Sequence, residues 1–371
     1  MIPFHKAHIT DDEINGVIEA VRSGWLTMGP KTIEFEKKFG EYIGVKNSVS
    51  MNSATAALHL ALKAIGLKAE DEVIIPTNTF IATAEVITYF NAIPVLCDIE
   101  PATHNIDSLN IEKKITKKTK AIIPVHFAGQ PCDMDEIMSI AKDNNLKVIE
   151  DAAHAIPASY KNQKIGTIGD ITCFSFYATK TLATGEGGMA TTDNDEYAKH
   201  MKINRLHGIS RDAWDRYTAA GSWYYEVIDN GNKYNTTDIN SALGLAQLKK
   251  VEWMQEQRAK IAAKYTKAFT NTKIVTPVIK NNRTSAWHLY VIKVANRDEL
   301  IEKLKDEGIG TSVHFIPVHR HPYYKNTYDY KQTDYPVAED IFLQSLSLPI
   351  YPGMTDEDID RVINKVIEHA K

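Results

Sequence analysis

The stretch that decides the fold is residues 170–192, D-I-T-C-F-S-F-Y-A-T-K-T-L-A-T-G-E-G-G-M-A-T-T. The apolar and aromatic residues 171–177 predict one strand, and residues 188–192, which open on two glycines, predict a second. Lys180 stands in the connection between them. A lysine amine held away from water loses proton affinity and becomes a nucleophile that can form a Schiff base with an aldehyde. The position therefore predicts a Schiff-base lysine, unless the ammonium group stays in water while its stem packs on the sheet.

Apolar runs that alternate with helices surround this stretch. Helices are expected from about residue 81 and over residues 134–143, and strands are expected over residues 72–76, 93–97, 120–126 and 146–150. Near-continuous apolar strands that alternate with helices indicate an α/β fold with a mostly parallel sheet buried on both faces. Ligands of such sheets bind at the carboxyl ends of the strands.

A turn of small polar residues falls at that edge of the sheet. Residues 47–51 predict a strand and residues 56–65 a helix, joined by the turn N-S-A-T at residues 52–55. The free N–H groups at the start of the helix suit a phosphate group, although Ser53 or Thr55 could equally act as a plain N-cap. The sequence holds no G-x-x-x-x-G-K-[ST] or G-x-G-x-x-G motif, so the usual nucleotide-binding loops do not explain the turn.

Asp151 and Phe80 fall at the same edge. Asp151 ends an apolar strand, where a carboxylate without a partner would be costly. It either pairs with the protonated ring nitrogen of pyridoxal phosphate or caps the following turn. Phe80 is either a ring lying on the face of that cofactor or a core side chain. Together with Lys180, these positions favour pyridoxal phosphate as the aldehyde.

We expect a large domain over residues 1–250 and a small C-terminal α+β domain over residues 251–371, with the boundary inside a long helix capped by residues 231–238. Other helices are expected after Thr10, from Pro30 and after Thr355. The small domain should hold strands over residues 288–294 and 311–315, and a helix over residues 297–308.

Three histidines, His314, His319 and His321, lie close together in the sequence. No carboxylate or cysteine completes a convincing ligand set with them, so hydrogen bonding to substrate or subunit is the preferred interpretation and a metal site is the lesser one. The aromatic segment 214–225 is too apolar to lie comfortably in water, and we expect it to cover a ligand or a neighbouring subunit.

The composition is that of an ordinary globular protein. The 371 residues are 43% hydrophobic and 24% charged, with a formal net charge of -4, so neither a nucleic-acid surface nor an anionic-membrane binder is indicated. The N-terminus lacks the pattern of a signal peptide and no stretch of eighteen apolar residues occurs, which predicts a cytoplasmic protein. The three scattered cysteines offer neither a disulfide framework nor a metal site.

With these residues in view, the chain resembles the sugar aminotransferases of the DegT/DnrJ/EryC1/StrS family, which are pyridoxal-phosphate enzymes of fold type I, with an aspartate aminotransferase-like architecture. The resemblance runs nearly end to end, and the H-G-I-S-R-D-A-W-D-R-Y stretch looks most like the group that aminates a UDP-4-keto-pentose. The matching motifs are S-G-W-L-T-M-G-P, N-S-A-T-A-A-L-H-L-A-L, E-D-A-A-H-A, F-S-F-Y-A-T-K-T-L-A-T-G-E-G-G, K-Y-N-T-T-D-I-N-S-A-L-G-L-A-Q-L and V-H-F-I-P-V-H.

The resemblance implies roles for individual residues. Lys180 would be the Schiff-base lysine, Asp151 the partner of the ring nitrogen, and Phe80 the ring stacked on the cofactor. His154 would lie beside the 3-hydroxyl, a position where the family often has Gln. The phosphate would be held by Ala54, Thr55 and Ser175 of one subunit and by Asn235 of the other subunit of a homodimer with shared active sites. The expected substrate contacts are Thr27, Met28, His207, His314, His319 and Tyr323.

The implied reaction is the transfer of an amine from glutamate to a nucleotide-linked ketosugar, a 4-keto-hexose or 4-keto-pentose, for cell-surface glycans such as lipopolysaccharide and O-antigen. Two alternatives remain. Some members of the family are sugar dehydratases, but the deoxygenating members replace the lysine with histidine, so Lys180 counts against that activity. The other alternative is a regulatory protein that only binds the cofactor. The sequence does not name the sugar, the nucleotide, the aminated carbon or the residues that bind the donor carboxylate.

Overall fold

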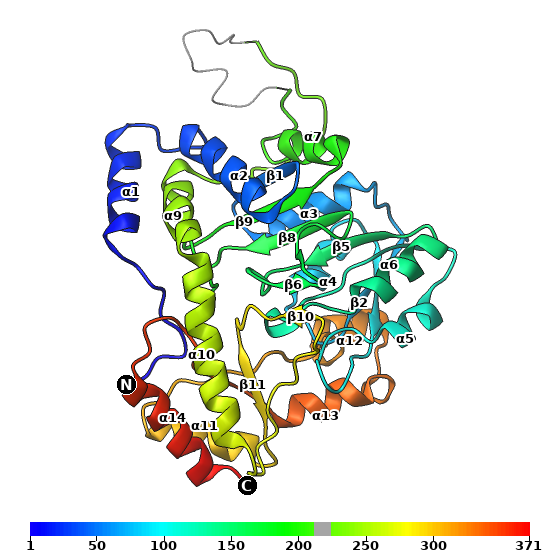
Figure 1. The fold of residues 1–371 in the computed structure, drawn as a ribbon. Helices are drawn as coiled ribbons and strands as arrows, with labels where there is room; N and C mark the ends of the chain where they lie inside the picture. The colour runs from blue at the N-terminus through cyan, green and yellow to red at the C-terminus, as the bar shows by residue number, and fades with distance from the viewer. Residues whose placement is uncertain (211–223) are drawn as a thin grey trace.

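A seven-stranded sheet forms the frame of the computed structural model, which describes residues 1–210 and 224–371 (Figure 1). The strand order is β1-β9-β8-β5-β4-β2-β3. The strands are β1 (Asn47–Met51), β2 (Glu72–Pro76), β3 (Ile93–Cys97), β4 (Thr119–Ile122), β5 (Lys147–Asp151), β8 (Ile171–Ser175) and β9 (Gly188–Thr192). The pairs from β8 through β5, β4 and β2 to β3 are parallel, which confirms the predicted mostly parallel sheet.

Strand β9 departs from this parallel arrangement, because it runs antiparallel to both of its neighbours, β1 and β8. The chain returns from β8 to β9 through residues 176–187 without a crossover helix, and a parallel neighbour would need such a crossover. Lys180 lies in this direct return, at the edge of the sheet where the parallel strands end.

Helices cover both faces of this sheet (Figure 1). The apolar side chains form one buried cluster on each face: Val73 and Ile75 of β2 belong to one, and Ile74 belongs to the other. This is the pattern expected of strands buried on both faces. The helices described in residues 1–210 and 224–249 are α1 (Asp11–Arg22), α2 (Pro30–Ile43), α3 (Ala54–Ala64), α4 (Ala82–Thr88), α5 (Ser108–Ile111), α6 (Met134–Asp143), α7 (Asp195–Asn204) and α9 (Asp238–Lys249), with the short 3-10 helices η1 (Glu112–Lys114) and η2 (Phe127–Gly129).

Helix α10 (Val251–Phe269) leads from the large sheet to a smaller sheet at the other end of the molecule (Figure 1). The expected single long helix is interrupted at Lys250, whose φ of -117° and ψ of 10° end α9 and precede α10. The remaining elements are β11 (Tyr290–Lys293), α11 (Arg297–Asp306), η3 (Val318–Arg320), α12 (Pro322–Tyr328), η4 (Gln332–Asp334), α13 (Pro336–Gln344), β12 (Ser345–Leu348) and α14 (Asp356–His369), with β10 (Arg283–Thr284) pairing β6 (Ser159–Tyr160), which also pairs β7 (Gln163–Lys164).

The predicted strand over residues 311–315 is wrong. In that segment only Ser312 makes a bridge, to Ser347, and the neighbour of β11 is instead β12. Short β12 has serines at alternate positions, so its apolar pattern is weak although the strand is buried.

A third apolar cluster joins α10, α11, α14 and this small sheet, and it includes Ile2. The backbone of Ile2 is bonded on both sides: its N–H donates to Gly308 at 2.8 Å and its carbonyl accepts from Gly310 at 2.8 Å. Residues from α12 and α13, such as Tyr324 and Ile341, pack instead in a cluster of the large sheet. The domain boundary at residue 250 stays a prediction.

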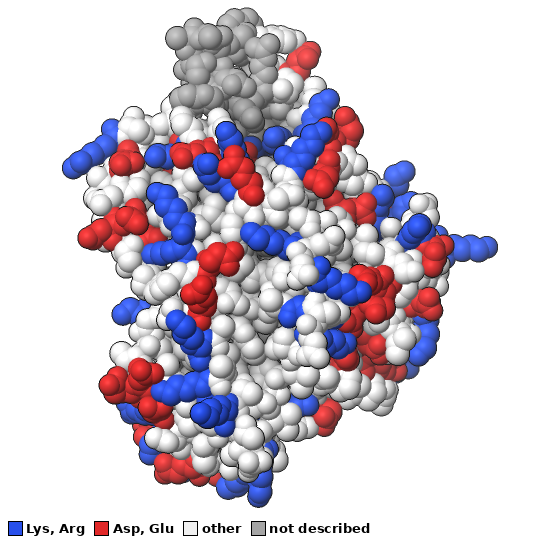
Figure 2. Space-filling model, in the orientation of Figure 1, with Lys and Arg blue, Asp and Glu red and all other residues white. Residues whose placement is uncertain are grey.

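The surface exposes apolar side chains of helix α1 and carries charges of both signs. Helix α1 buries Glu13 and Ala20, whereas its apolar side chains Ile14, Ile18 and Val21 are 38–52% exposed. On the face shown in Figure 2, Lys and Arg side chains mix with Asp and Glu and do not gather into a patch of one sign. None of the helices in residues 1–210 and 224–371 is both long and apolar enough to cross a membrane.

Candidate active site

A cavity of about 590 Å³ opens at the carboxyl ends of the parallel strands. Its walls come from the β1–α3 turn, the residues after β2, β5 and β8, and, from the small-sheet side, residues around His288, His314 and Ile350. The volume suits a cofactor with part of a substrate. The predicted residues that line this cavity are Ala54, Thr55, Phe80, Asp151, His154, Ser175, Lys180 and His314.

Lys180 lines the cavity from the β8–β9 connection, and its backbone N–H donates to the Tyr177 carbonyl at 2.8 Å. Burial lowers the pKa of its ammonium group from 10.5 to about 8, while the negative charge of Asp151 opposes this shift. A lysine of this kind holds an appreciable neutral fraction near pH 7, which is what a nucleophile or a base requires.

Asp151 ends β5 and is 5% exposed. Its carboxylate accepts hydrogen bonds from the Thr83 hydroxyl at 2.8 Å and from the Ala153 N–H at 3.1 Å. Burial nevertheless raises the pKa of this carboxyl above its usual value. Two donors therefore do not fully compensate the buried carboxylate, and a cation beside it would stabilise the charged form.

The first turn of α3 supplies hydrogen-bond donors to the cavity. Ser53 is the N-cap, and its hydroxyl accepts from the Ala56 N–H at 3.1 Å. Helical geometry leaves the N–H groups of Ala54 and Thr55 without partners within the helix. Strand β9 passes so close to this turn that a Cβ added at Gly188 would lie 2.4 Å from the Ser53 carbonyl. Glycine is therefore required at position 188. The free N–H groups at the start of α3 suit a phosphate group.

Four imidazoles surround the cavity: those of His5, His154, His288 and His314. The rings of His154 and His288 lie 4.4 Å apart, and both are more than nine-tenths buried. Burial is the main cause that lowers the pKa of all four, to about 4 for His5 and His314 and well below 6.5 for the other two. The rings are therefore neutral at pH 7 and offer hydrogen bonds without positive charge.

Sequence reasoning missed His5 and His288. His288 lies within the apolar run A-W-H-L-Y-V, at the start of a predicted strand, and a histidine interrupting such a run was the available signal. His5 has no comparable signal, because its place depends on how Ile2 pairs with residues 308–310.

Several predicted contacts do not line the cavity of one chain. Thr27 and Met28 lie between α1 and α2, where the Thr27 carbonyl accepts from Asp238 N–H and the Met28 carbonyl accepts from the Trp25 indole. His319 is fully buried, with its ring nitrogens 2.6 Å from the Thr77 hydroxyl and from the Glu339 carboxylate.

His207, Tyr323 and Asn235 also lie outside the lining. Tyr323 is 60% exposed, and Asn235 follows Tyr234, whose carbonyl accepts from the Asn52 N–H at 2.7 Å. Asn235 therefore lies beside the phosphate end of the cavity without lining it. Of the aromatic segment 214–225, residues 214–223 lie outside the described part of the chain. No group of three or more His, Cys, Asp and Glu within residues 1–210 and 224–371 could hold a metal ion.

Known proteins are similar to this chain over nearly its whole length. A model of the DegT/DnrJ/EryC1/StrS aminotransferase family matches residues 7–367. The spore coat polysaccharide biosynthesis protein SpsC of Bacillus subtilis is 50% identical, with all of this chain and 97% of SpsC covered. An uncharacterised protein of Methanocaldococcus jannaschii is 54% identical, with 98% of this chain and 96% of that protein covered.

Solved structures share the fold over the whole chain. The putative sugar aminotransferase Spr1654 of Streptococcus pneumoniae, in its PMP form, has a TM-score of 0.94 and 35% identity, covering 99% of this chain and 98% of its own. Helicobacter pylori PseC, an aminotransferase involved in the biosynthesis of pseudoaminic acid, has a TM-score of 0.93 and 28% identity, covering 100% and 99%.

The polar groups of the cavity match the polar groups of pyridoxal phosphate. The α3 N-terminus suits its phosphate, Asp151 suits its ring nitrogen and Lys180 suits its aldehyde. Spr1654 was solved with this cofactor as well. The chain therefore belongs to the DegT/DnrJ/EryC1/StrS aminotransferase family, as a fold type I sugar aminotransferase that depends on pyridoxal phosphate.

Proposed function

We propose that this enzyme transfers the amine of glutamate to a nucleotide-linked 4-ketosugar, a hexose or a pentose, in the synthesis of a surface polysaccharide. The observation that carries the proposal is Lys180, with a pKa lowered to about 8, in a cavity that also has room for a sugar. The polysaccharide is supported by the 50% identity to SpsC, and amination of a sugar by the likeness to PseC. The UDP-pentose subgroup and the cytoplasmic location stay predictions.

Each residue has a defined task in this proposal. Pyridoxal phosphate, when bound, supplies an electron sink for the carbon that bears the amine. Asp151 holds a proton at the ring nitrogen, and the N–H groups of Ala54 and Thr55 with the Ser175 hydroxyl hold the phosphate. Phe80, 59% exposed at the cavity wall, covers one face of the ring. Lys180 Nζ takes a proton from the amine-bearing carbon of the donor and returns one to the former keto carbon of the sugar.

We further infer a homodimer in which Asn235 reaches the phosphate of the partner's site. Two observations on this chain support it. Asn235 follows Tyr234, which bonds the β1–α3 turn, and its side chain does not line the cavity of its own chain. The exposed stripe Ile14, Ile18 and Val21 on α1 is an apolar surface that a second copy would cover.

Product analysis tests the reaction. The cofactor-loaded enzyme is mixed with glutamate and the visible absorbance is followed, after which 3-keto and 4-keto nucleotide sugars are added one at a time and the products weighed by mass spectrometry. We expect glutamate to bleach the absorbance and a 4-keto substrate to gain an amine. An unchanged absorbance would indicate a protein that only binds the cofactor, and a product that has lost a hydroxyl would indicate a dehydratase.

A further inference from the structure

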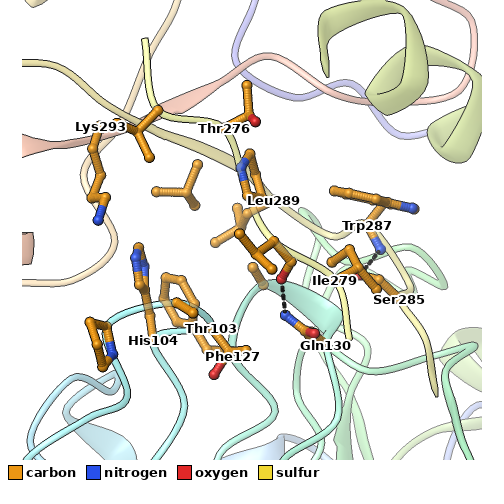
Figure 3. Close-up of a pocket in the computed structure, with 17 residues that line it drawn as sticks. Thr103, His104, Phe127, Gln130, Thr276, Ile279, Ser285, Trp287, Leu289 and Lys293 are labelled. Carbon is orange, nitrogen blue, oxygen red and sulfur yellow. Dashed lines mark hydrogen bonds between the residues drawn. The ribbon is translucent and has the colours of Figure 1, made fainter. Parts of the chain in front are cut away.

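A second cavity, of about 100 Å³, lies next to the active-site cavity and is shown in Figure 3. It is formed where residues 101–104 and 127–130 of the large-sheet part meet residues 275–279 and 285–293. Leu289 lines both this cavity and the active-site cavity, whereas Lys293 and His104 line only the second one. The second cavity is thus a separate space that shares one wall with the active site.

Most polar groups of the second cavity are already bonded to its wall. Gln130 donates to the Val278 carbonyl at 2.9 Å (Figure 3). Its side-chain oxygen accepts from the Lys280 N–H at 3.0 Å. The Ser285 hydroxyl accepts from the Trp287 N–H at 3.1 Å, and the Thr103 hydroxyl donates to Glu100 at 2.6 Å. These groups hold the wall together and are not available to a ligand.

Within the described chain, four lining side chains have polar groups without a hydrogen-bond partner: His104, Thr276, Trp287 and Lys293. The two that can carry a charge, His104 and Lys293, belong to one end of the cavity. Lys293 forms no ion pair or side-chain hydrogen bond with any residue of the described chain, and its amine points toward the His104 ring (Figure 3). His104 is 8% exposed, and neither of its ring nitrogens has a partner among residues 1–210 and 224–371. Burial and the charge of Lys293 lower the pKa of His104 to about 4, so its ring is neutral and can donate one N–H.

The remaining wall is apolar, and its backbone is strained. Phe127, Leu289 and Val291 are each at most 5% exposed. Three lining residues that are not glycine, His104, Ala128 and Trp287, have positive φ angles of 62°, 57° and 49°. Such strain gathers at ligand sites more often than elsewhere. The Glu100 carboxylate, which bonds the lining residue Thr103, is paired with Lys280 at 2.9 Å.

We propose that this second cavity is a binding site for a small carboxylate, held by Lys293 and His104 at its head and by Phe127, Leu289 and Val291 along its apolar body. An apolar cavity of about 150 Å³ holds benzene, so about 100 Å³ leaves space for roughly four to five non-hydrogen atoms. Propionate has this size and this combination of charge and apolar surface. The proposal does not depend on which donor or sugar the active site uses.

The test compares propionate with its neutral isostere propionamide on the cofactor-loaded enzyme, by saturation-transfer NMR titration. We expect saturable binding of propionate and a dissociation constant at least about tenfold higher for the amide, because the amide loses the hydrogen bond to a charged group. Lys293→Met, which keeps the stem and removes the charge, should weaken propionate by about the same factor. The matched control Lys305→Met, at a side chain that is 74% exposed, should not change it.

A second variant guards against a folding defect in Lys293→Met. Ala102 is an exposed residue of the cavity wall, and Ala102→Trp should block the site without disturbing the core. If propionate binds Lys293→Met and Ala102→Trp as tightly as it binds the wild-type enzyme, it is bound elsewhere, for example in the active site. This result overturns the proposal. The absence of saturable binding, or equal affinity for the amide, overturns it as well.

Discussion

At the scale of single residues, the cofactor site is built from groups that lie just after strand ends. Lys180 follows β8, and Asp151 is the last residue of β5. The negative charge of Asp151 raises the pKa of Lys180, whereas burial lowers it. The pKa of Lys180 should therefore change when the charge of Asp151 is removed.

We expect attachment of added pyridoxal phosphate to the cofactor-free enzyme to follow the neutral form of Lys180. Because the pKa of Lys180 is lowered to about 8, the rate should rise about tenfold per pH unit below this value and level off above it. Asp151→Asn removes the charge that raises this pKa, so its curve should shift to lower pH. The measurement is the rate of the absorbance change between pH 6 and 10.

Asp170→Asn is the matched control for that curve, because the Asp170 carboxylate is bonded to Lys147 and to the Val148 N–H rather than to the cavity. Its midpoint should equal that of the wild type. A wild-type midpoint near 10.5, or a shift to higher pH in Asp151→Asn, would contradict the assignment of Lys180 as the lysine that receives the cofactor.

The cavity residues that could be predicted share one property: each lies next to a strand or helix end that is visible in the sequence. Ala54, Asp151 and Lys180 are examples, because a parallel sheet brings such ends to one edge whatever the details. His5 and His288 reach the same cavity from the N-terminal segment and the small sheet. Their places depend on packing between distant segments, which local patterns do not encode.

At the scale of elements, the start of α2 depends on a residue far away in the sequence. Its N-cap, Gly29, has no side chain to accept hydrogen bonds. The carboxylate of Asp238, at the start of α9, accepts instead from the N–H groups of Gly29 at 2.8 Å and Thr32 at 3.0 Å and from the Thr32 hydroxyl at 2.7 Å. One carboxylate therefore caps a helix and joins it to another.

Asp238→Asn should lower the free energy of unfolding by about 1–3 kcal/mol, because its NH₂ group would replace the second carboxylate oxygen, which accepts from the Lys31 N–H at 3.1 Å in a buried place. Urea denaturation of the two proteins measures the difference. Asp11→Asn, an exposed acidic residue in the first turn of α1, is the control and should cost less than about 1 kcal/mol. Equal losses in both variants would show that Asp238 acts only as a helix-end charge.

Short strands are the elements for which the sequence patterns fail. The strands of the large sheet were predicted because apolar runs bounded by turns are unambiguous when both faces are buried. The predicted strand 311–315 and the unpredicted β12 show the opposite case. Both are short, and the choice between them rests on which one pairs with β11 rather than on either sequence.

At the scale of the whole molecule, the proposed shared site predicts complementation between two inactive variants. Each proposed site takes Lys180 from one chain and Asn235 from the other. In a heterodimer of Lys180→Ala and Asn235→Trp, one site therefore contains both substitutions and the other contains neither. Random mixing by co-refolding should therefore restore about a quarter of wild-type activity, since half of the dimers are mixed and each has one good site.

The control mixes Lys180→Ala with Asp151→Asn. Both residues line the cavity of one chain, so each site of that heterodimer keeps one lesion and activity should stay near that of the parents. If the first mixture also stays inactive, or if a monomer is fully active, Asn235 does not cross to a partner.

The pairing of Ile2 with residues 308–310 also sets an order of events during synthesis. Ile2 is synthesised about three hundred residues before its backbone partners Gly308 and Gly310. At about 5–20 residues per second, this is a wait of roughly 15 to 60 seconds. His5 is carried by the same segment, so its wall of the active site is completed only after residues 308–310 have been translated.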